Sequence, residues 1–175
     1  MTTSLAVSSP QEASAATPSP SAVVTAVLDT NVVLDLMLFK DPRVQALRQA
    51  LGAQGLRWIA TERMLDELGQ VLRRAALAHW GHDSDQMMAE ARCLCQPVAS
   101  LAETAGRVPR CTDPDDQMFI DLAWRCPATL LFSRDRALLR LARPARLHGL
   151  WIGTPERWPA KIVNHPEQRR PKPPL

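Results

Sequence analysis

The feature of the sequence that most constrains the fold is a pair of short apolar runs, each followed by an acidic residue. Residues 22–28 (AVVTAVL) end at Asp29, and residues 128–132 (ATLLF) end three residues before Asp135. Such runs are typical of strands buried on both faces of a parallel sheet. Because α/β folds bind ligands at the carboxyl edge of the sheet, we expect both acids to share a crevice there. A single acid at this position is often only the cap of the next helix.

The rest of the chain alternates between strand patterns and apolar residues at helical spacing. Strands are predicted at 22–28, 56–60, 128–132 and 147–152, and helices at 42–51, 61–72, 83–95, 118–123 and 138–141, with another helix start at 154–156. In the 83–95 helix, Met87, Met88, Ala91 and Leu94 are expected to face inward, and Pro97 is expected to end the helix. The alternation predicts a three-layer α/β/α sandwich around a central parallel sheet.

Composition divides the chain into three parts. Residues 1–21 are rich in Ser, Thr, Ala and Pro and are expected to form a disordered leader, without the features of a signal or transit peptide. Residues 22–163 are expected to form one domain, followed by a basic, proline-rich tail at 164–175. With no apolar run long enough for a membrane span, we expect a cytoplasmic protein. A net charge of +3 is compatible with an anionic partner.

Cysteine and histidine patterns argue against zinc and against histidine-based catalysis. The four cysteines match no paired metal-ligand spacing. Without a secretory signal, they are expected to be reduced thiols. The four histidines are scattered along the chain. Any catalytic site must therefore rely on other side chains.

The segment Asp113-Pro114-Asp115-Asp116 supplies acids just before the helix that precedes the 128–132 strand. The helix N-terminus can therefore open onto the same crevice, which makes Asp116 the favoured candidate. The alternative is structural: Asp113 as the N-cap, Pro114 in the first turn, and the acids placed favourably in the helix dipole. The sequence leaves the role of Asp113 open between a ligand and a cap.

Glu67 is the acid of the 61–72 helix that helical geometry singles out. It lies at the margin of the apolar face, whereas Glu62 and Asp66 point further toward solvent. A residue at the margin can reach a cleft while its helix stays packed. The alternative is a surface acid that pairs with Arg63 or Arg74.

Several carboxylates in one crevice repel each other by about 1 to 4 kcal/mol per close pair. A bound cation offsets that repulsion, and an all-oxygen ligand set suits Mg²⁺ or Mn²⁺. One or two such ions activate a water for attack on phosphorus. The constellation therefore predicts phosphodiester hydrolysis.

The motifs, taken together, resemble those of the PIN-domain family, and most closely its toxin components of bacterial toxin–antitoxin systems. The similar segments are 27–34 (VLDTNVVL), 67–72 (ELGQVL), 113–120 (DPDDQMFI), 131–139 (LFSRDRALL) and 153–156 (GTPE), which together span about residues 23–160. The resemblance implies a Rossmann-like sandwich and a Mg²⁺- or Mn²⁺-dependent endoribonuclease that prefers single-stranded RNA. It also implies structured RNA as another substrate class, a protein antitoxin as a partner, and a homodimer.

The resemblance also implies roles for individual residues. The metal-binding and catalytic acids are Asp29, Glu67, Asp116 and Asp135, with Asp113 as a fifth ligand, supported through hydrogen bonds by Thr30, Asn31 and Ser133. Arg134 and Arg136 are candidate phosphate contacts, although solvated arginines are an equal alternative. The leader and the basic tail are departures from the family pattern and inherit no role.

Two other functions compete with this hypothesis. A phosphohydrolase of the haloacid-dehalogenase type also begins with an Asp after its first strand, but it needs a second Asp two positions later, where this chain has Asn31. A PIN scaffold that binds RNA or protein without cutting is the alternative outside enzymes. The presence of all four key acids favours the nuclease.

Overall fold

The structure is a computed structural model that describes residues 23–99, 108–126 and 128–158. The predicted leader (residues 1–21) and the predicted tail (residues 164–175) lie outside the described residues. Within those ranges, no helix combines the length and the apolar character needed to cross a bilayer.

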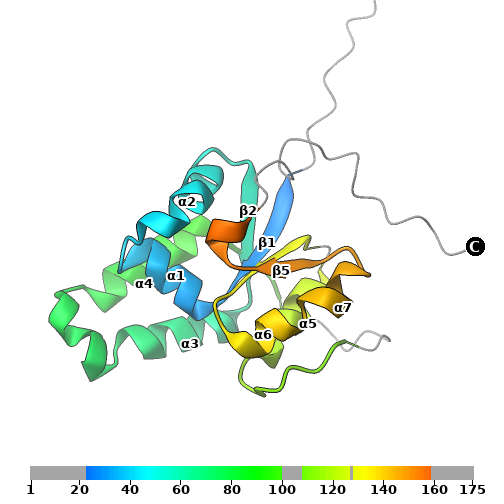
Figure 1. The fold of residues 1–175 in the computed structure, drawn as a ribbon. Coiled ribbons are helices and arrows are strands. Elements are labelled where there is room, and N and C mark those ends of the chain that lie inside the picture. The colour runs from blue at the N-terminus through cyan, green and yellow to red at the C-terminus, as the bar shows by residue number, and fades with distance from the viewer. Residues whose placement is uncertain (1–22, 100–107, 127, 159–175) are drawn as a thin grey trace, which may run out of the picture.

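A five-stranded parallel sheet forms the centre of the fold, with strand order β3-β2-β1-β4-β5 (Figure 1). The strands are β1 (Val24–Leu28), β2 (Leu56–Ala60), β3 (Cys95–Pro97), β4 (Leu130–Phe132) and β5 (Trp151–Gly153). Val27 of β1 is paired in register with Ile59 of β2 on one side and Leu131 of β4 on the other. This central position explains the near-continuous apolar sequence of β1, because layers cover both of its faces.

Helices flank the sheet. They are α1 (Thr30–Met37), α2 (Gln45–Gly52), α3 (Glu62–Leu72), α4 (Ser84–Leu94), α5 (Gln117–Arg125), α6 (Arg136–Arg140) and α7 (Ala142–Arg146), with 3₁₀ turns η1 (Pro42–Val44), η2 (Ala75–Trp80) and η3 (Pro155–Arg157). In Figure 1, α1 to α4 gather on one side of the sheet and α5 to α7 on the other. The prediction of an α/β fold with a central parallel sheet is confirmed.

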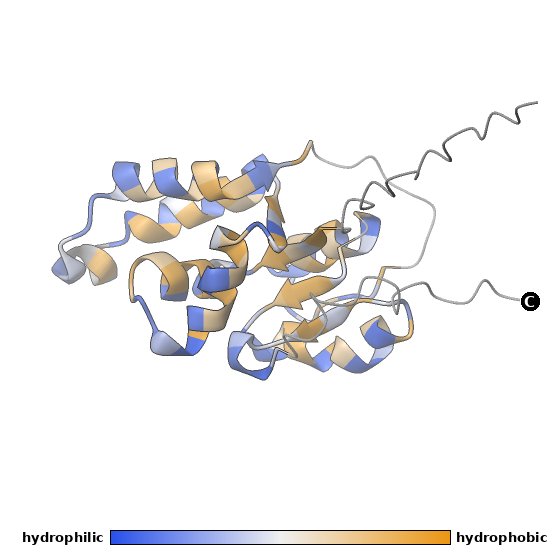
Figure 2. Cartoon of the chain, turned by 90° about the horizontal axis from the view of Figure 1, so that it is seen from above, coloured by the Kyte–Doolittle hydropathy of each residue, from blue (hydrophilic) through white to orange (hydrophobic). Residues whose placement is uncertain are grey.

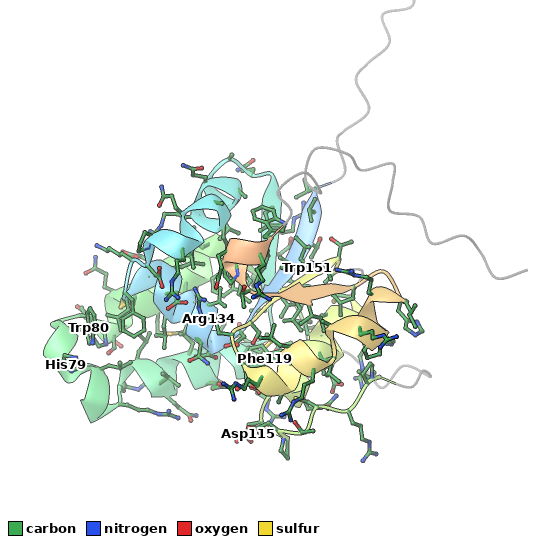
Figure 3. All side chains as sticks on the ribbon, viewed as in Figure 1. His79, Trp80, Asp115, Phe119, Arg134 and Trp151 are labelled. Atoms are coloured by element: carbon green, nitrogen blue, oxygen red, sulfur yellow. The ribbon has the colours of Figure 1, made fainter. Side chains whose placement is uncertain are left out.

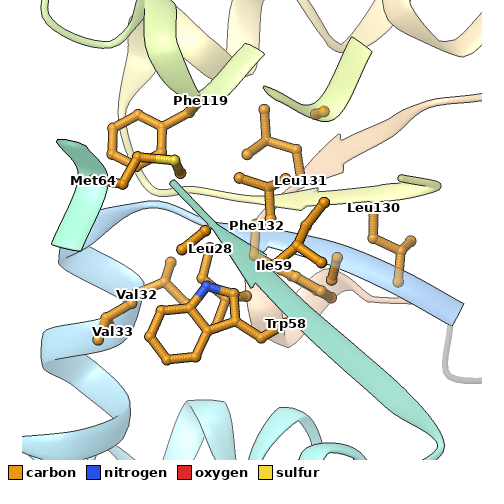
Figure 4. Packing of buried hydrophobic residues seen from close by; sticks show 14 of the residues in the cluster. Leu28, Val32, Val33, Trp58, Ile59, Met64, Phe119, Leu130, Leu131 and Phe132 are labelled. Atoms are coloured by element: carbon orange, nitrogen blue, oxygen red, sulfur yellow. The ribbon is translucent and has the colours of Figure 1, made fainter. Parts of the chain in front are cut away.

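The core lies where the helices meet the sheet. Figure 4 shows Trp58 of β2 and Phe132 of β4 among the buried aliphatic side chains, with Phe119 of α5 packed above Met64 of α3. In Figure 2 the strands are coloured as hydrophobic, whereas hydrophobic and hydrophilic residues alternate along the helices. The same alternation in the sequence predicted amphipathic helices, each with one face on the sheet.

Several predicted boundaries are confirmed. Strand β2 has the predicted limits, and Thr61 caps α3, its hydroxyl accepting a hydrogen bond from the Met64 N–H at 3.4 Å. Asp83 caps α4 by accepting from the Asp85 N–H at 2.9 Å. The start of the predicted 42–51 helix differs: Asp41 caps the 3₁₀ turn η1, and α2 itself begins at Gln45 and ends at Gly52.

Other boundaries were wrong at the C-terminal half of the sheet. The predicted strand 147–152 forms only at Trp151–Gly153, because α7 continues to Arg146 and a turn follows it. Leu147, assigned to that strand, lies in the turn and is 83% exposed. Strand β4 begins at Leu130, two residues later than predicted. Thr154 precedes a short 3₁₀ turn and makes no side-chain cap hydrogen bond.

The end of α4 also differs from the prediction. Leu94 was expected to face inward but is 52% exposed, whereas Met87 and Ala91 of the same helix are buried. The helix stops at Leu94, and residues Cys95–Pro97 form the edge strand β3. The sequence predicted that Pro97 ends a helix, and instead it ends an edge strand, the place where a sheet tolerates proline.

Candidate active site

The carboxyl ends of β1 and β4 lie side by side at the place in the sheet where the strand order reverses. From β1 the chain continues to β2 on one side, and from β4 it continues to β5 on the other. When the connections after two adjacent strands lead to opposite sides of the sheet, a crevice forms at the carboxyl ends of those strands. α/β proteins bind ligands in this crevice. Asp29 follows β1 directly and Asp135 lies shortly after β4, so both acids stand at this crevice.

Asp29 is a buried carboxylate held by two hydrogen bonds. One oxygen accepts from the backbone N–H of Asn31 at 2.6 Å, which caps α1, and the other accepts from the Ser133 hydroxyl. The side chain is only 2% exposed. Burial raises the pKa of Asp29 despite these bonds, and the nearby Asp135 carboxylate raises it further. The charged form is therefore costly unless a cation compensates it.

Ser133 links Asp29 to Asp135. It is fully buried, and its hydroxyl oxygen accepts a hydrogen bond from the Asp135 N–H at 2.9 Å while its proton is donated to Asp29. Asp135 in turn caps α6 by accepting from the Ala137 N–H at 2.5 Å. One side chain thus fixes the positions of two acids that come from different strands.

Replacing Ser133 by alanine is expected to lower the free energy of unfolding by about 1–3 kcal/mol, because the change leaves the Asp135 N–H and an Asp29 oxygen without their buried partner. Urea unfolding measures the loss. Ser84→Ala is the control, since the Ser84 hydroxyl makes a longer bond to the Leu72 carbonyl at 3.3 Å, outside the crevice. An equal loss in both variants would contradict the linking role of Ser133.

Glu67 reaches the crevice from α3. Its Oε1 accepts a hydrogen bond from the hydroxyl of Thr30 at 3.1 Å. Thr30 is the residue that directly follows Asp29. Burial raises the pKa of Glu67, and the negative charges of Asp29 and Asp115 add to the effect. Its neighbour Asp66 is exposed.

The alternative pairing of Glu67 with a surface arginine is not what the structure shows. In the described part of the chain, Glu67 forms no ion pair with Arg63 or Arg74. The outward-facing acid Glu62 instead forms an ion pair with Arg92 at 2.8 Å, on the exposed face of α3 and α4. The helical-wheel distinction between these acids therefore agrees with their placement.

Asp116 completes the group from the start of α5. It occupies the N-cap position but makes no side-chain cap hydrogen bond, so its carboxylate is not used to begin the helix. Burial raises the pKa of Asp116 to about 7, with further contributions from the charges of Asp135 and Asp29. An acid with this pKa is close to half-protonated at neutral pH.

Asp113 is placed differently from Asp116. It is exposed, and its Oδ1 accepts a hydrogen bond from the Asp115 N–H at 3.0 Å, in the turn that precedes α5. The alternative of Asp113 as the N-cap of α5 is therefore wrong, because α5 begins at Gln117. Its charge still contributes to the raised pKa of Asp116, which places Asp113 within electrostatic reach of the crevice.

Arg134 is held by carboxylates of the protein itself. Its Nε lies 2.6 Å from Asp35 of α1, its Nη1 2.9 Å from Glu156 of η3, and its Nη2 3.8 Å from Asp41. Figure 3 shows Arg134 beside α1. Its side chain is only 22% exposed. The side chain joins three elements at the carboxyl edge and is not free in the crevice as a phosphate contact. Arg136, by contrast, is exposed and unpaired among the described residues.

The acids around Arg134 were not predicted from the sequence. The helix α1 was not predicted, so Asp35 was not recognised as a residue that faces the Ser133–Asp135 loop. The available signal was the spacing of Val32, Val33 and Leu36, all buried, which leaves Asp35 on the flank of the helix.

The donor set suits a hard divalent cation. The carboxylate oxygens of the crevice are the ligands that Mg²⁺ and Mn²⁺ prefer, and Ser133 and Thr30 already orient two of the acids. Over the described ranges, no three Asp, Glu, His or Cys side chains lie in a group that could hold a metal ion. Mg²⁺ usually binds through one or two carboxylates while it retains water.

The fold and the site together define the class of the protein. It is an α/β protein with a parallel sheet and an acidic crevice at the carboxyl ends of β1 and β4. The model of a family described as PIN domain matches residues 25–137, more than half of the chain, and this range contains every acid of the crevice. The chain belongs to the PIN domain family. No curated protein and no solved structure gives a significant match.

Family membership indicates the general class of activity. PIN domains are generally nucleases, so the match supports a hydrolase that acts on nucleic acid. It leaves the dehalogenase-type alternative without support.

Proposed function

We propose that the protein is a metal-dependent endoribonuclease that hydrolyses single-stranded RNA, with Asp29, Glu67, Asp116 and Asp135 as its metal ligands and catalytic acids. The observation that carries this proposal is that acids from separate segments of the chain are held together at the carboxyl ends of β1 and β4, where burial raises the pKa of Asp29, Glu67 and Asp116. Burial and mutual repulsion disfavour their ionised forms together, and a divalent cation is the ligand that reverses this cost.

The residues of the chain prepare the site in defined ways. Ser133 and the Asn31 N–H direct the two oxygens of Asp29, and Thr30 directs Glu67. Asp116 enters from the start of α5, and we assign Asp113 to a fifth, outer ligand position. Mg²⁺ or Mn²⁺ held by these acids would lower the pKa of a bound water and would neutralise negative charge on the phosphate.

Metal removal and a pair of neighbouring acids test the proposal. Purified protein is expected to cleave a fluorescent single-stranded RNA with Mn²⁺ or Mg²⁺ and to lose cleavage in EDTA. Glu67→Gln is expected to reduce the rate by more than about 10-fold, because it removes a charged ligand. Asp66→Asn, one residue away on the exposed face of α3, removes the same charge and should leave the rate unchanged.

Two results would overturn the proposal. Cleavage that persists in EDTA would remove the metal from the mechanism. A pure protein that binds RNA but cuts none with either metal would make the chain a non-catalytic PIN scaffold.

We further infer that this nuclease acts in the cytoplasm as the toxin of a toxin–antitoxin pair. In this proposal it binds a protein antitoxin and forms a homodimer. The support is the resemblance of the five motifs to that subgroup. Growth arrest on expression, dependent on the acids of the crevice, is the expected consequence.

A further inference from the structure

Four arginines follow the crevice on α6 and α7. They are Arg136, Arg140, Arg143 and Arg146. All are exposed, and none forms an ion pair with another described residue. Residues 136–150 contain no Asp or Glu at all. This segment is therefore cationic without local compensation, unlike Arg134 in its cage of acids.

The arginines lie on the exposed sides of α6 and α7. Leu141 joins the two short helices, as the C-cap of α6 and the N-cap of α7. Arg136 and Arg140 are one turn apart on α6, and Arg143 and Arg146 are about one turn apart on α7, so each pair shares the exposed side of its helix. Leu138 and Ala145 are fully buried and occupy the opposite face. The packing of α6 and α7 on the sheet thus turns the arginines outward.

The arginine face begins at the active site. Arg136 directly follows Asp135, and α6 and α7 run from the carboxyl edge back along the side of the sheet that carries α5 (Figure 1). At about 1.5 Å per residue, the segment from Arg136 to Arg146 spans roughly 15 Å. A polyanion that enters the crevice therefore meets a line of positive charges next to the acids.

We propose that the arginine face of α6 and α7 binds the phosphodiester backbone of single-stranded RNA and guides the strand into the acidic crevice. This rests on the proposed function. Guanidinium groups bind phosphates with paired N–H donors, and contacts to phosphate position a nucleic acid without reading its sequence. A negative crevice alone repels RNA, so the neighbouring cations supply the attraction that brings the strand to it.

The salt dependence of binding tests the proposal. A short fluorescein-labelled oligouridine is titrated with full-length protein carrying Asp29→Asn to prevent cleavage, and anisotropy gives Kd between about 50 and 200 mM salt. Each lost phosphate contact reduces the slope of log Kd against log salt by about 0.7 for a single strand. Changing Arg136, Arg140 and Arg143 together to Gln is expected to reduce the slope by about 2.

Arg57→Gln is the matched control. Arg57 is an exposed arginine near the amino end of β2, away from the crevice, and it also lacks an ion pair among the described residues. Its loss should leave the slope unchanged, whereas Arg140→Gln alone should lower it by about 0.7. Unchanged melting temperatures show that the variants remain folded.

The outcomes separate this inference from the proposed nuclease function. Cleavage by the native protein together with unchanged slopes in the arginine variants overturns the inference and leaves the nuclease standing. Arginine-dependent binding without any cleavage supports the inference while the proposed function fails. An equal change of slope in Arg57→Gln would mean that the arginines attract RNA only diffusely, which overturns the inference. Tighter binding of poly-glutamate than of oligouridine would assign the arginines to an acidic protein partner and also overturns it.

Discussion

Asp29→Asn is expected to reduce RNA cleavage by more than about 100-fold while leaving the fold intact. Removing a residue that only orients a metal ligand already costs about 10- to 100-fold. Asp29 is itself the most buried acid of the crevice, so its loss should cost more. The amide has nearly the shape of the carboxylate and can still accept from the Asn31 N–H. Single-turnover cleavage of labelled RNA measures the effect.

The stability of Asp29→Asn distinguishes a catalytic role from a structural one. Because burial raises the pKa of Asp29, a neutral amide relieves an unfavourable charge, and the melting temperature without metal should not fall. The Ser133 hydroxyl can reorient to accept from the amide N–H₂. A variant that loses activity only because it unfolds would contradict this prediction.

The same variant tests the toxin role in cells. Expression of the native chain is expected to arrest bacterial growth, whereas Asp29→Asn should permit it, because arrest requires RNA cleavage. Asp66→Asn, which alters an exposed acid, should arrest growth as the native chain does. Normal growth with a native chain that cuts RNA in vitro would retain the nuclease and remove the toxin role.

The second large effect is an unusual pH dependence of stability. Without divalent metal, the melting temperature is expected to fall by several degrees as pH rises from 5 to 8. The folded pKa of Asp116 is about 7, above its unfolded value of 3.8, so between these pH values the folded state binds more protons than the unfolded state. Stability therefore falls as pH rises through this window, and the raised pKa values of Asp29 and Glu67 act in the same direction.

Metal should reverse this trend. Mn²⁺ binds the ionised carboxylates, so its stabilising effect is expected to be larger at pH 7.5 than at pH 5.5, and differential scanning fluorimetry measures both. Each kcal/mol corresponds to roughly 3 °C for a domain of this size. Asp116→Asn should flatten the metal-free profile. Measurements start at pH 5 because the lowered pKa of Asp41, about 2, affects stability only at more acidic pH.

A melting temperature that rises between pH 5 and pH 8, or that Mn²⁺ does not change at either pH, would contradict an assembled acidic site. Asp85→Asn serves as the control, since Asp85 lies exposed on α4. Its removal should leave the pH profile of the native chain unchanged.

The sequence predicted the central strands better than the outer ones, for a physical reason. Strand β1 is covered on both faces and paired on both sides, so its apolar run records its environment directly. Edge strands are paired on one side only, and β3 and β5 are three residues long. Such strands have too few buried positions to give a recognisable pattern in the sequence. Leu147 was predicted to belong to the last strand only because it is apolar.

The acids at the site could be predicted because strand ends fix their position, whereas the hydrogen bonds between them could not. Asp29 and Asp135 follow buried strands, and helical geometry separated Glu67 from Asp66. The caging of Arg134 by Asp35, Asp41 and Glu156 depends on the relation of α1, η1 and η3 in space. No spacing along the chain encodes that relation.

The edge strand β3 constrains how copies of this chain can associate. The Val98 N–H donates inward to the Ala60 carbonyl at 2.9 Å, so the nitrogen of Pro97, one residue earlier, faces outward. Proline has no hydrogen there to offer an incoming strand, which blunts this edge against sheet extension. A continuous sheet across a dimer is therefore disfavoured at β3, and we expect copies of the chain that associate to do so through other surfaces.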